Sequence, residues 1–262
     1  MAEYESLNYA LQDHVATITL DRPEVKNAMS WVMFGEIGDA FERAGNNDMV
    51  RCVVVTGAGG AFCSGADLKD PANLTTSESE ARDRMQTIDG IVQKVATCPK
   101  PTIAMVTGVA AGAGCNLALL CDMVVASRDA RFAELFVKRG LVVDFGGTWA
   151  LTRLLPLHRA KELALLGDMI SAEEAEGLGL VNRLCDAAEI EDVVNELAAR
   201  LAAQPPRTVS LIKENLNRAV ERSLEENLAA ENASQPLCLT SEDTREAVMA
   251  WVEKREPHFT GR

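Results

Sequence analysis

The sequence predicts an α/β fold with a helical C-terminal region. Up to residue 185, short apolar segments rich in β-branched residues alternate with segments of helical periodicity. From about residue 189 onward, only amphipathic patterns of Leu, Ala and Glu remain. With 262 residues, of which 47% are hydrophobic, the chain suits one large domain, or one domain with a helical appendage.

The expected strands are apolar runs that end at turn residues. Segment 14–20 alternates apolar and polar residues, which indicates a strand with one buried face. Segment 51–57 is a continuous apolar run, typical of a strand buried on both faces. Further strands are expected at 101–108 and 123–127, and a last short one at 181–185.

The expected helices begin and end at residues with known capping or breaking properties. Ser30 is a favoured N-cap for a helix over 31–46, and the prolines of segment 98–101 end a polar helix over 77–97. Another helix is expected after the glycines at 112–114. Amphipathic helices are expected at 189–203, 206–220, 223–233 and 242–254. The Gln204-Pro205-Pro206 break predicts a core at 1–203 and a C-terminal helical region at 204–262.

Composition excludes several classes of partner. A net charge of −13 argues against nucleic acid and anionic membranes, because neutralising phosphates requires clustered Lys and Arg. No apolar run approaches the roughly 18 residues of a membrane span, and the acidic N-terminus has no signal-peptide pattern. Seven cysteines without a CxxC pair suit reduced core thiols, so a cytoplasmic location is expected. With three histidines and no Cys/His cluster, no metal site is expected.

Two strand-to-turn segments repeat one pattern. Val-Thr-Gly ends a strand at 55–57 and again at 106–108, and each is followed by small residues, at 64–67 and 112–114. Small residues allow close approach, and a turn that opens a helix presents unpaired N–H groups. Two such turns can direct two N–H donors at one oxygen, which is the arrangement of an oxyanion hole. Tight packing of the two turns explains the same glycines, and the spacing leaves both interpretations open.

The motifs in these turns resemble those of a known family. FCSGADL at 62–68 and GVAAGAGCNLALLCD at 108–122 are similar to the signature segments of the crotonase superfamily, the enoyl-CoA hydratases and isomerases. Segments 22–29, 151–184 and 254–261 extend the resemblance over nearly the whole chain. The resemblance implies a ClpP-like spiral of ββα units with C-terminal helices at subunit contacts, in a homotrimer or a hexamer of two trimers. It also implies an acyl-CoA substrate, with coenzyme A present only as part of the thioester and no permanently bound cofactor.

The resemblance assigns roles to particular residues. The main-chain N–H groups of Ala66 and Ala113 match the oxyanion hole that holds the thioester carbonyl and stabilises an enolate. The positions implied for coenzyme A are Lys26, Ala28, Ala66, Asp67 and Leu68, and Arg22 is a candidate for contact with its phosphates. Plain solvation explains the charged residues among them equally well. Lys254 and Phe259 match a tail segment that reaches the ligand of a neighbouring subunit.

The chain departs from the hydratase pattern at both catalytic glutamates. Asn116 and Phe136 occupy those two positions, so both are expected in the substrate pocket without carrying a proton. Glu134 is two residues out of register and is expected to point elsewhere. The ordinary two-carboxylate hydration mechanism is therefore not expected.

Asp144, in GLVVDFGGTW at 140–149, stands where hydratases usually have glycine. This segment resembles that of the ring-1,2-epoxyphenylacetyl-CoA isomerases, and one carboxylate is enough to move a proton between two carbons. Neighbours such as Val142, Val143 and Phe145 are expected to help desolvate Asp144 and raise its pKa. The alternative role for Asp144 is the N-cap of a helix that begins near Gly146.

The expected function is an acyl-CoA isomerase that uses Asp144 as acid and base to shift a proton or to rearrange a ring epoxide, and the sequence does not specify the acyl group. The alternatives are an enoyl-CoA hydratase with atypical catalytic residues and an inactive scaffold that binds CoA esters. A dehalogenase with a nucleophilic aspartate is disfavoured, because His14, His158 and His258 lie outside the matching loops.

Overall fold

A six-stranded sheet forms the centre of the protein. The computed structural model describes residues 4–75 and 77–262, and its main sheet has the strand order β1-β2-β3-β4-β6-β9. β1 and β2 are antiparallel, and the later neighbours are parallel. The strands are β1 (Leu7–Gln12), β2 (Val15–Leu20), β3 (Cys52–Gly57), β4 (Thr102–Val106), β6 (Met123–Ser127) and β9 (Arg183–Cys185).

A smaller sheet lies beside the main one and is built from the same repeats. Its order is β5-β7-β8, where β5 is Val109–Ala111, β7 is Arg131–Ala133 and β8 is Met169–Ser171. β5 follows β4 after two residues, and β7 follows β6 after three, so each pair supplies one strand to each sheet. Helix α3 (Ala113–Leu120) follows the first pair, and α4 (Gly147–Leu154) follows the second. The chain therefore winds as the expected spiral of ββα units.

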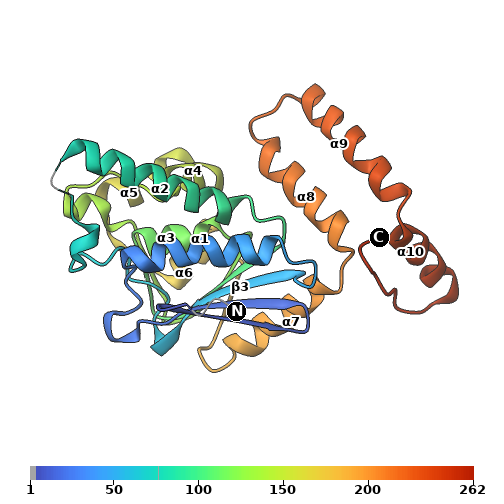
Figure 1. The fold of residues 1–262 in the computed structure, drawn as a ribbon, viewed down its shortest axis with the longest axis horizontal. Helices are drawn as coiled ribbons and strands as arrows, with labels where there is room; N and C mark the ends of the chain where they lie inside the picture. Colours follow the sequence, from blue (N-terminus) through green and yellow to red (C-terminus); the bar gives the residue numbers. More distant parts are fainter. Residues whose placement is uncertain (1–3, 76) are drawn as a thin grey trace.

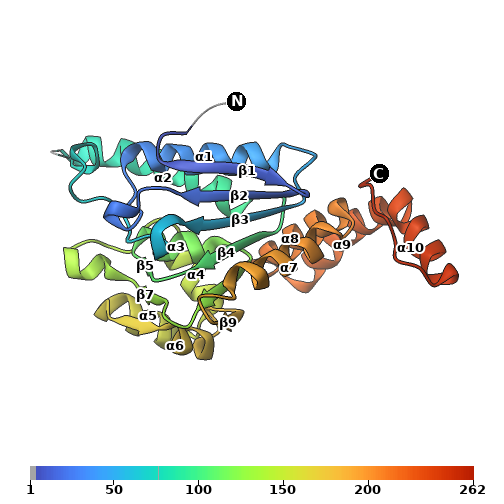
Figure 2. The same ribbon diagram turned by 90° about the horizontal axis from the view of Figure 1, so that it is seen from below.

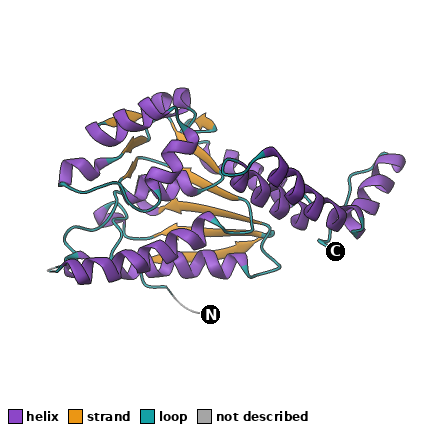
Figure 3. Cartoon of the chain, turned by 90° about the horizontal axis from the view of Figure 1, so that it is seen from above, coloured by secondary structure: helices purple, strands orange, loops and turns teal. Residues whose placement is uncertain are grey.

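Helices cover both faces of the main sheet. α1 (Trp31–Gly45) and α2 (Glu78–Ala96) run side by side over one face, together with α3 (Figure 1). α7 (Ile190–Ala202) covers the opposite face, where it contacts β3, β4 and β6. In Figure 1, β3 lies between α1 and α7, and Figure 3 shows the strands in orange with helices in purple around them. The other two helices of the core are α5 (Leu157–Leu166) and α6 (Ala172–Leu178).

Alternate residues of β3 belong to two separate apolar clusters. Val53 and Val55 pack in the cluster beneath α1 and α2, whereas Cys52 and Val54 pack in the cluster beneath α7. Successive side chains of a strand point to opposite faces, so a strand covered on both sides must be apolar throughout. This explains the unbroken apolar run at 51–57. Six of the seven cysteines are buried, as expected for core thiols.

Three C-terminal helices extend away from the sheets. They are α8 (Pro206–Ala219), α9 (Leu224–Leu239) and α10 (Glu242–Glu253), and Figure 2 shows them projecting from one end of the core. α8 and α9 bury none of their residues in the single chain. Their exposed apolar side chains include Ile212, Leu216, Val220, Leu224, Leu228, Leu237 and Leu239. None of the described helices combines the length and hydrophobicity that crossing a membrane requires.

The structure confirms the expected strands and helices and adds elements that the sequence did not indicate. β1 was not expected, because Leu7 is its single buried residue and no alternation marks it. β7 and β8 have three residues each, too few to produce a periodic pattern. α9 was expected to end at 233 but continues to Leu239 through Pro236. Pro236 lies in the last turn, where a missing N–H removes one helical hydrogen bond without breaking the helix elsewhere.

Candidate active site

Two glycine-containing turns meet where strands of the two sheets end. Cys63 pairs with Ala110 of β5 in a parallel bridge, which brings the turn at 64–67 beside the start of α3. A Cβ atom on Gly65 would lie 2.8 Å from the Ala111 carbonyl oxygen, and one on Gly114 would collide with the Cys63 carbonyl. Only glycine allows the two turns to approach this closely. Tight packing and the presentation of N–H groups therefore occur together here.

Ala66 and Ala113 lie at this junction. Within the described chain, neither main-chain N–H donates a backbone hydrogen bond outside regular helices and strands. Ala113 is the first residue of α3, so its N–H has no partner within the helix. Both residues line one cavity. Two main-chain N–H groups without a backbone partner thus lie at one cavity, and their expected role of holding a single oxygen stays a prediction.

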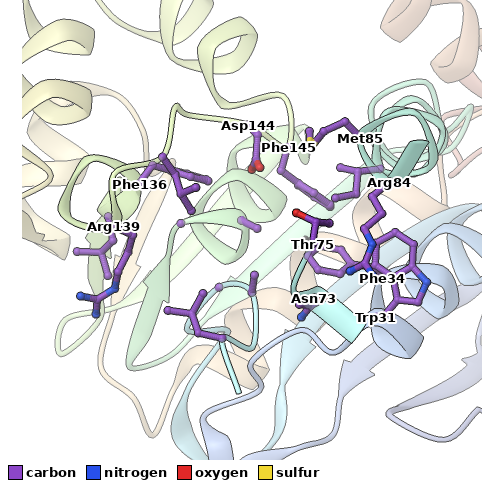
Figure 4. Close-up of a pocket in the computed structure, with 18 of the residues that line it drawn as sticks. Trp31, Phe34, Asn73, Thr75, Arg84, Met85, Phe136, Arg139, Asp144 and Phe145 are labelled. Atoms are coloured by element: carbon purple, nitrogen blue, oxygen red, sulfur yellow. The ribbon is translucent and has the colours of Figure 1, made fainter. Parts of the chain in front are cut away.

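The cavity beside these turns has a volume of about 360 Å³ and a mainly apolar lining. Phe34 is 6.3 Å from Trp31 and 5.7 Å from Phe145, measured between ring centroids. In Figure 4 these rings lie on one side of the cavity and Phe136 on the other. The volume and the aromatic lining suit the acyl portion of a small organic ligand. Helix α2 contributes Ala81, Arg84, Met85 and Ile88.

Asp144 is the one carboxylate among the described residues that line the cavity. It lies on the loop before α4, and its carboxylate points into the cavity between Phe136 and Phe145 (Figure 4). Burial raises the pKa of Asp144 to about 6, and the negative charge of Asp89 on α2 adds to the rise. A carboxyl group with this pKa can accept a proton and return it near neutral pH.

The alternative role of Asp144, as an N-cap, is wrong. The N-cap of α4 is Gly146, with φ +75°, and no side chain caps this helix. Only the main-chain carbonyl of Asp144 takes part, accepting 2.9 Å from the Gly147 N–H. The expectation for its neighbours is confirmed for Phe145, which is buried, and wrong for Val142, which is 83% exposed.

Of the two residues that stand in place of the hydratase glutamates, Phe136 lines the cavity and Asn116 does not. Phe136 lines the cavity as expected. The expectation that Asn116 lines it is wrong: Asn116 is fully buried on α3, and its Nδ2 donates 2.8 Å to the main-chain carbonyl of Asp144. The amide thus bonds the loop that carries Asp144 and is not among the described residues that line the cavity.

Glu134 points away from the cavity, as expected. It is 3% exposed, and it borders a separate small void together with Cys115, Leu151, Leu163 and Ile170. The side chain therefore cannot replace either missing hydratase glutamate in this arrangement.

Most of the residues expected near coenzyme A lie on two linked loops, at 22–28 and 66–68. Arg22 donates 2.6 Å to the Ala28 carbonyl and forms an ion pair of 2.9 Å with Asp67. Burial alone would raise the pKa of Asp67, but the Lys69 N–H and the Arg22 guanidinium hold that pKa below its usual range. Arg22 is thus engaged within the protein and joins the two loops.

The other expected positions around coenzyme A differ in their distance from the cavity. Leu68 lines the cavity, and its side chain is 55% exposed. Lys26 is exposed and does not line the cavity. Its main-chain carbonyl accepts a 3.0 Å hydrogen bond from the N–H of Ser64, which does line the cavity. Lys254 ends α10, and Phe259 lies in the tail, and neither lines the cavity of its own chain. Their expected role at a neighbouring subunit stays a prediction.

Several lining residues were not identified from the sequence. Trp31 and Phe34 are three residues apart on α1, and Ala81, Arg84, Met85 and Ile88 follow helical spacing on α2. That spacing was visible, but it equally describes side chains packed in a core. None of the three histidines lines the cavity, and the described residues contain no group of three or more His, Cys, Asp or Glu side chains suited to a metal.

Comparison with known proteins places these features in a family. The model of the enoyl-CoA hydratase/isomerase family matches residues 10–262. The chain is 40% identical to "1,2-epoxyphenylacetyl-CoA isomerase" of Escherichia coli (strain K12), with 95% of each chain covered. It is also 40% identical to "Probable enoyl-CoA hydratase" of Rhodobacter capsulatus, with 99% of each covered. The crystal structure of enoyl-CoA hydratase from Bacillus anthracis has a TM-score of 0.93 at 31% identity and covers 98% of this chain and 100% of its own. The chain therefore belongs to the enoyl-CoA hydratase/isomerase family and has its crotonase fold.

Proposed function

We propose that this protein is an acyl-CoA isomerase in which Asp144 carries the proton. One observation supports this most strongly: among the described residues, Asp144 is the single carboxylate in the cavity that also contains Ala66 and Ala113. A reaction that adds water needs groups to position and activate that water, whereas a proton shift needs one base that then acts as an acid.

The proposed reaction begins with the thioester carbonyl between the two alanine N–H groups. These donors stabilise the negative charge that develops on the carbonyl oxygen when the substrate becomes an enolate. The Asp144 carboxylate takes a proton from one carbon of the acyl group, the electron pair moves into the conjugated enolate, and the same carboxyl returns the proton to another carbon. The double bond shifts, and no atom is gained or lost.

The cavity lining supports a ring in the acyl group. Trp31, Phe34, Phe136 and Phe145 offer aromatic surfaces around Asp144. Aromatic rings pack favourably against one another in offset or tilted arrangements. Similarity to a 1,2-epoxyphenylacetyl-CoA isomerase agrees with an aryl acetyl group, including its ring epoxide.

An enoyl-CoA hydratase is the second candidate, because several relatives carry that name. Mass detection separates the candidates: isomerisation leaves the mass of the CoA ester unchanged, whereas hydration adds one water. The purified protein is assayed with 2-enoyl, 3-enoyl and ring-epoxide CoA esters. We expect new isomers of unchanged mass. A product that has gained water would support the hydratase, and tight binding without turnover would support the inactive scaffold.

We further infer that the chain assembles as a homotrimer, or as a hexamer of two trimers, in the cytoplasm. The exposed apolar side chains of α8 and α9 are the observation that supports assembly, since such faces are normally covered by a partner. Buried thiols agree with a reducing compartment. Light scattering after gel filtration tests the assembly: three or six times the 28.3 kDa chain mass is expected, and a monomer would contradict it.

A further inference from the structure

The loop that carries Asp144 is held from behind by a buried amide. Asn116 Nδ2 donates 2.8 Å to the Asp144 carbonyl, which also accepts from the Gly147 N–H. A Cβ atom on Gly147 would collide with the Asn116 side chain, so the amide lies directly against the start of α4. The Asn116 Oδ1 atom is buried and has no hydrogen-bond partner.

A second unpartnered group lies next to this amide. Both carboxyl oxygens of Glu134 are buried without a hydrogen bond, and the side chain is aimed at Cys115 and Asn116. The other walls around Glu134 are apolar: Leu151 on α4, Leu163 on α5 and Ile170 on β8. None of these walls supplies a cation. A charged carboxylate here would lack the pairing that buried charges require.

A neutral carboxyl group and a primary amide satisfy each other. The neutral carboxyl supplies an O–H donor, and the Asn116 Oδ1 atom is the acceptor that the structure leaves without a partner. The Nδ2 atom keeps its hydrogen bond to the Asp144 carbonyl. We propose that Glu134 is a positioning residue whose neutral carboxyl pairs with the Asn116 amide and thereby fixes the loop that presents Asp144. The inference rests on the proposed role of Asp144.

If Glu134 pairs in its neutral form, enzyme activity should depend on the protonation state of Glu134. Burial raises the pKa of Glu134 to about 7, contacts with Cys115 and Asn116 lower it, and the charge of Asp144 raises it. The ionisable groups that face it are the Cys115 thiol on α3 and the Asp144 carboxyl, which itself faces Asp89 on α2. Above pH 7, Glu134 loses the donated proton and becomes a second negative charge behind Asp144. The loop is then less well fixed, and kcat decreases while KM for the thioester stays nearly constant.

Three variants test the pairing by their pH profiles. Glu134→Gln keeps a donor and an acceptor but cannot ionise, so it should retain the kcat of the wild type near pH 6.5 and lose the decline above pH 7. Glu134→Met removes the pairing and should reduce kcat about tenfold or more with little change in KM, as expected for a misplaced catalytic group. Cys115→Ala should keep the kcat of the wild type near pH 6.5 and move the decline to higher pH, because the contact with Cys115 lowers the pKa of Glu134. The inference is wrong if Glu134→Gln declines like the wild type, if Glu134→Met keeps full kcat, or if Cys115→Ala reproduces Glu134→Met.

A measurement without substrate separates this inference from the proposed function. Because Asp144 also titrates near pH 6, the spectra are recorded in the Asp144→Asn background, where Glu134 is the one of these two carboxyls that remains. Infrared difference spectra between pH 6 and pH 8 should then show the C=O stretch of a neutral carboxylic acid that disappears at pH 8, and this band should be absent from the double variant Asp144→Asn/Glu134→Gln. If this band is found but Asp144→Asn remains active, the pair exists and the role of Asp144 is wrong. If Asp144→Asn is inactive but the band is missing, the role of Asp144 stands and the neutral Glu134 pair is refuted.

Discussion

The side-chain amide of Asn116 donates a 2.8 Å hydrogen bond to the main-chain carbonyl of Asp144. In hydratases of this family the position of Asn116 belongs to a catalytic glutamate, whereas here the residue is fully buried and supports the loop of another carboxylate. The side chain therefore bonds the loop that carries Asp144 and does not line the cavity.

Asn116→Ala should lower kcat about tenfold or more, because the loop loses one of the two donors to the Asp144 carbonyl, and small displacements of a catalytic group are costly. Steady-state kinetics should show the change in kcat with little change in KM. The matched control is Asn182→Ala, since Asn182 Oδ1 accepts 2.7 Å from the Val124 N–H far from the cavity. Equal losses of kcat in both variants would mean that the Asn116 effect is one of general stability.

Ala113→Pro should remove one oxyanion donor without disturbing α3. Ala113 is the first residue of the helix, where proline is tolerated because the N–H has no helical partner. Loss of one such donor lowers kcat by about 100-fold or more. Glu78→Pro makes the same change at the exposed first residue of α2 and should leave kcat nearly unchanged. A fully active Ala113→Pro protein with native circular dichroism would exclude this N–H from the oxyanion hole.

Asp89→Asn should lower the pKa of Asp144. Burial is the main reason that this pKa is about 6, and the charge of Asp89 is the second. Asp144 must be ionised to accept a proton, so kcat/KM rises with pH through about 6 in the wild type. Without the Asp89 charge, the rise should occur at lower pH. Asp83→Asn, on the same helix, should leave the profile in place, and an unchanged profile in Asp89→Asn would contradict the electrostatic coupling.

The free energy of unfolding of Glu134→Gln, relative to that of the wild type, should be larger at pH 8 than at pH 5. The pKa of Glu134 is about 7 in the folded protein, against about 4.3 in an unfolded chain. The folded state thus holds a proton that the unfolded state has lost, so wild-type stability falls as pH rises between these two values. The difference amounts to on the order of 3 kcal/mol. Urea denaturation of both proteins at the two pH values measures it, and a pH-independent difference would mean that Glu134 does not titrate in this range.

The sequence predicted the architecture because strong local patterns determine it. Apolar runs such as 51–57 and the N-cap at Ser30 lead to the same elements in the structure, where the Ser30 side chain accepts from the Met33 N–H. β1 could not be predicted, since its pairing with β2 needs main-chain hydrogen bonds and little apolar burial. The end of α9 was misplaced because Pro236 usually ends a helix, whereas here the helix continues through it to Leu239 and packs against α8.

The sequence predicted those parts of the site that depend on the identity of a single residue. Asp144, Ala66, Ala113 and Phe136 do line one cavity. The location of Asn116 could not be inferred, because the helical face it occupies depends on how α3 packs beneath the Asp144 loop. The same holds for Trp31 and Met85, whose cavity is closed only when α1 and α2 lie side by side.

Asp144→Asn tests the central claim most directly. The variant keeps the size of the side chain but cannot accept a proton, so turnover of 3-enoyl and ring-epoxide CoA esters should fall by about 100-fold or more. Binding of the same esters, measured by calorimetry, should stay close to that of the wild type, because Ala66, Ala113 and the aromatic lining are unchanged. Retention of most of the wild-type turnover by Asp144→Asn would show that another group moves the proton.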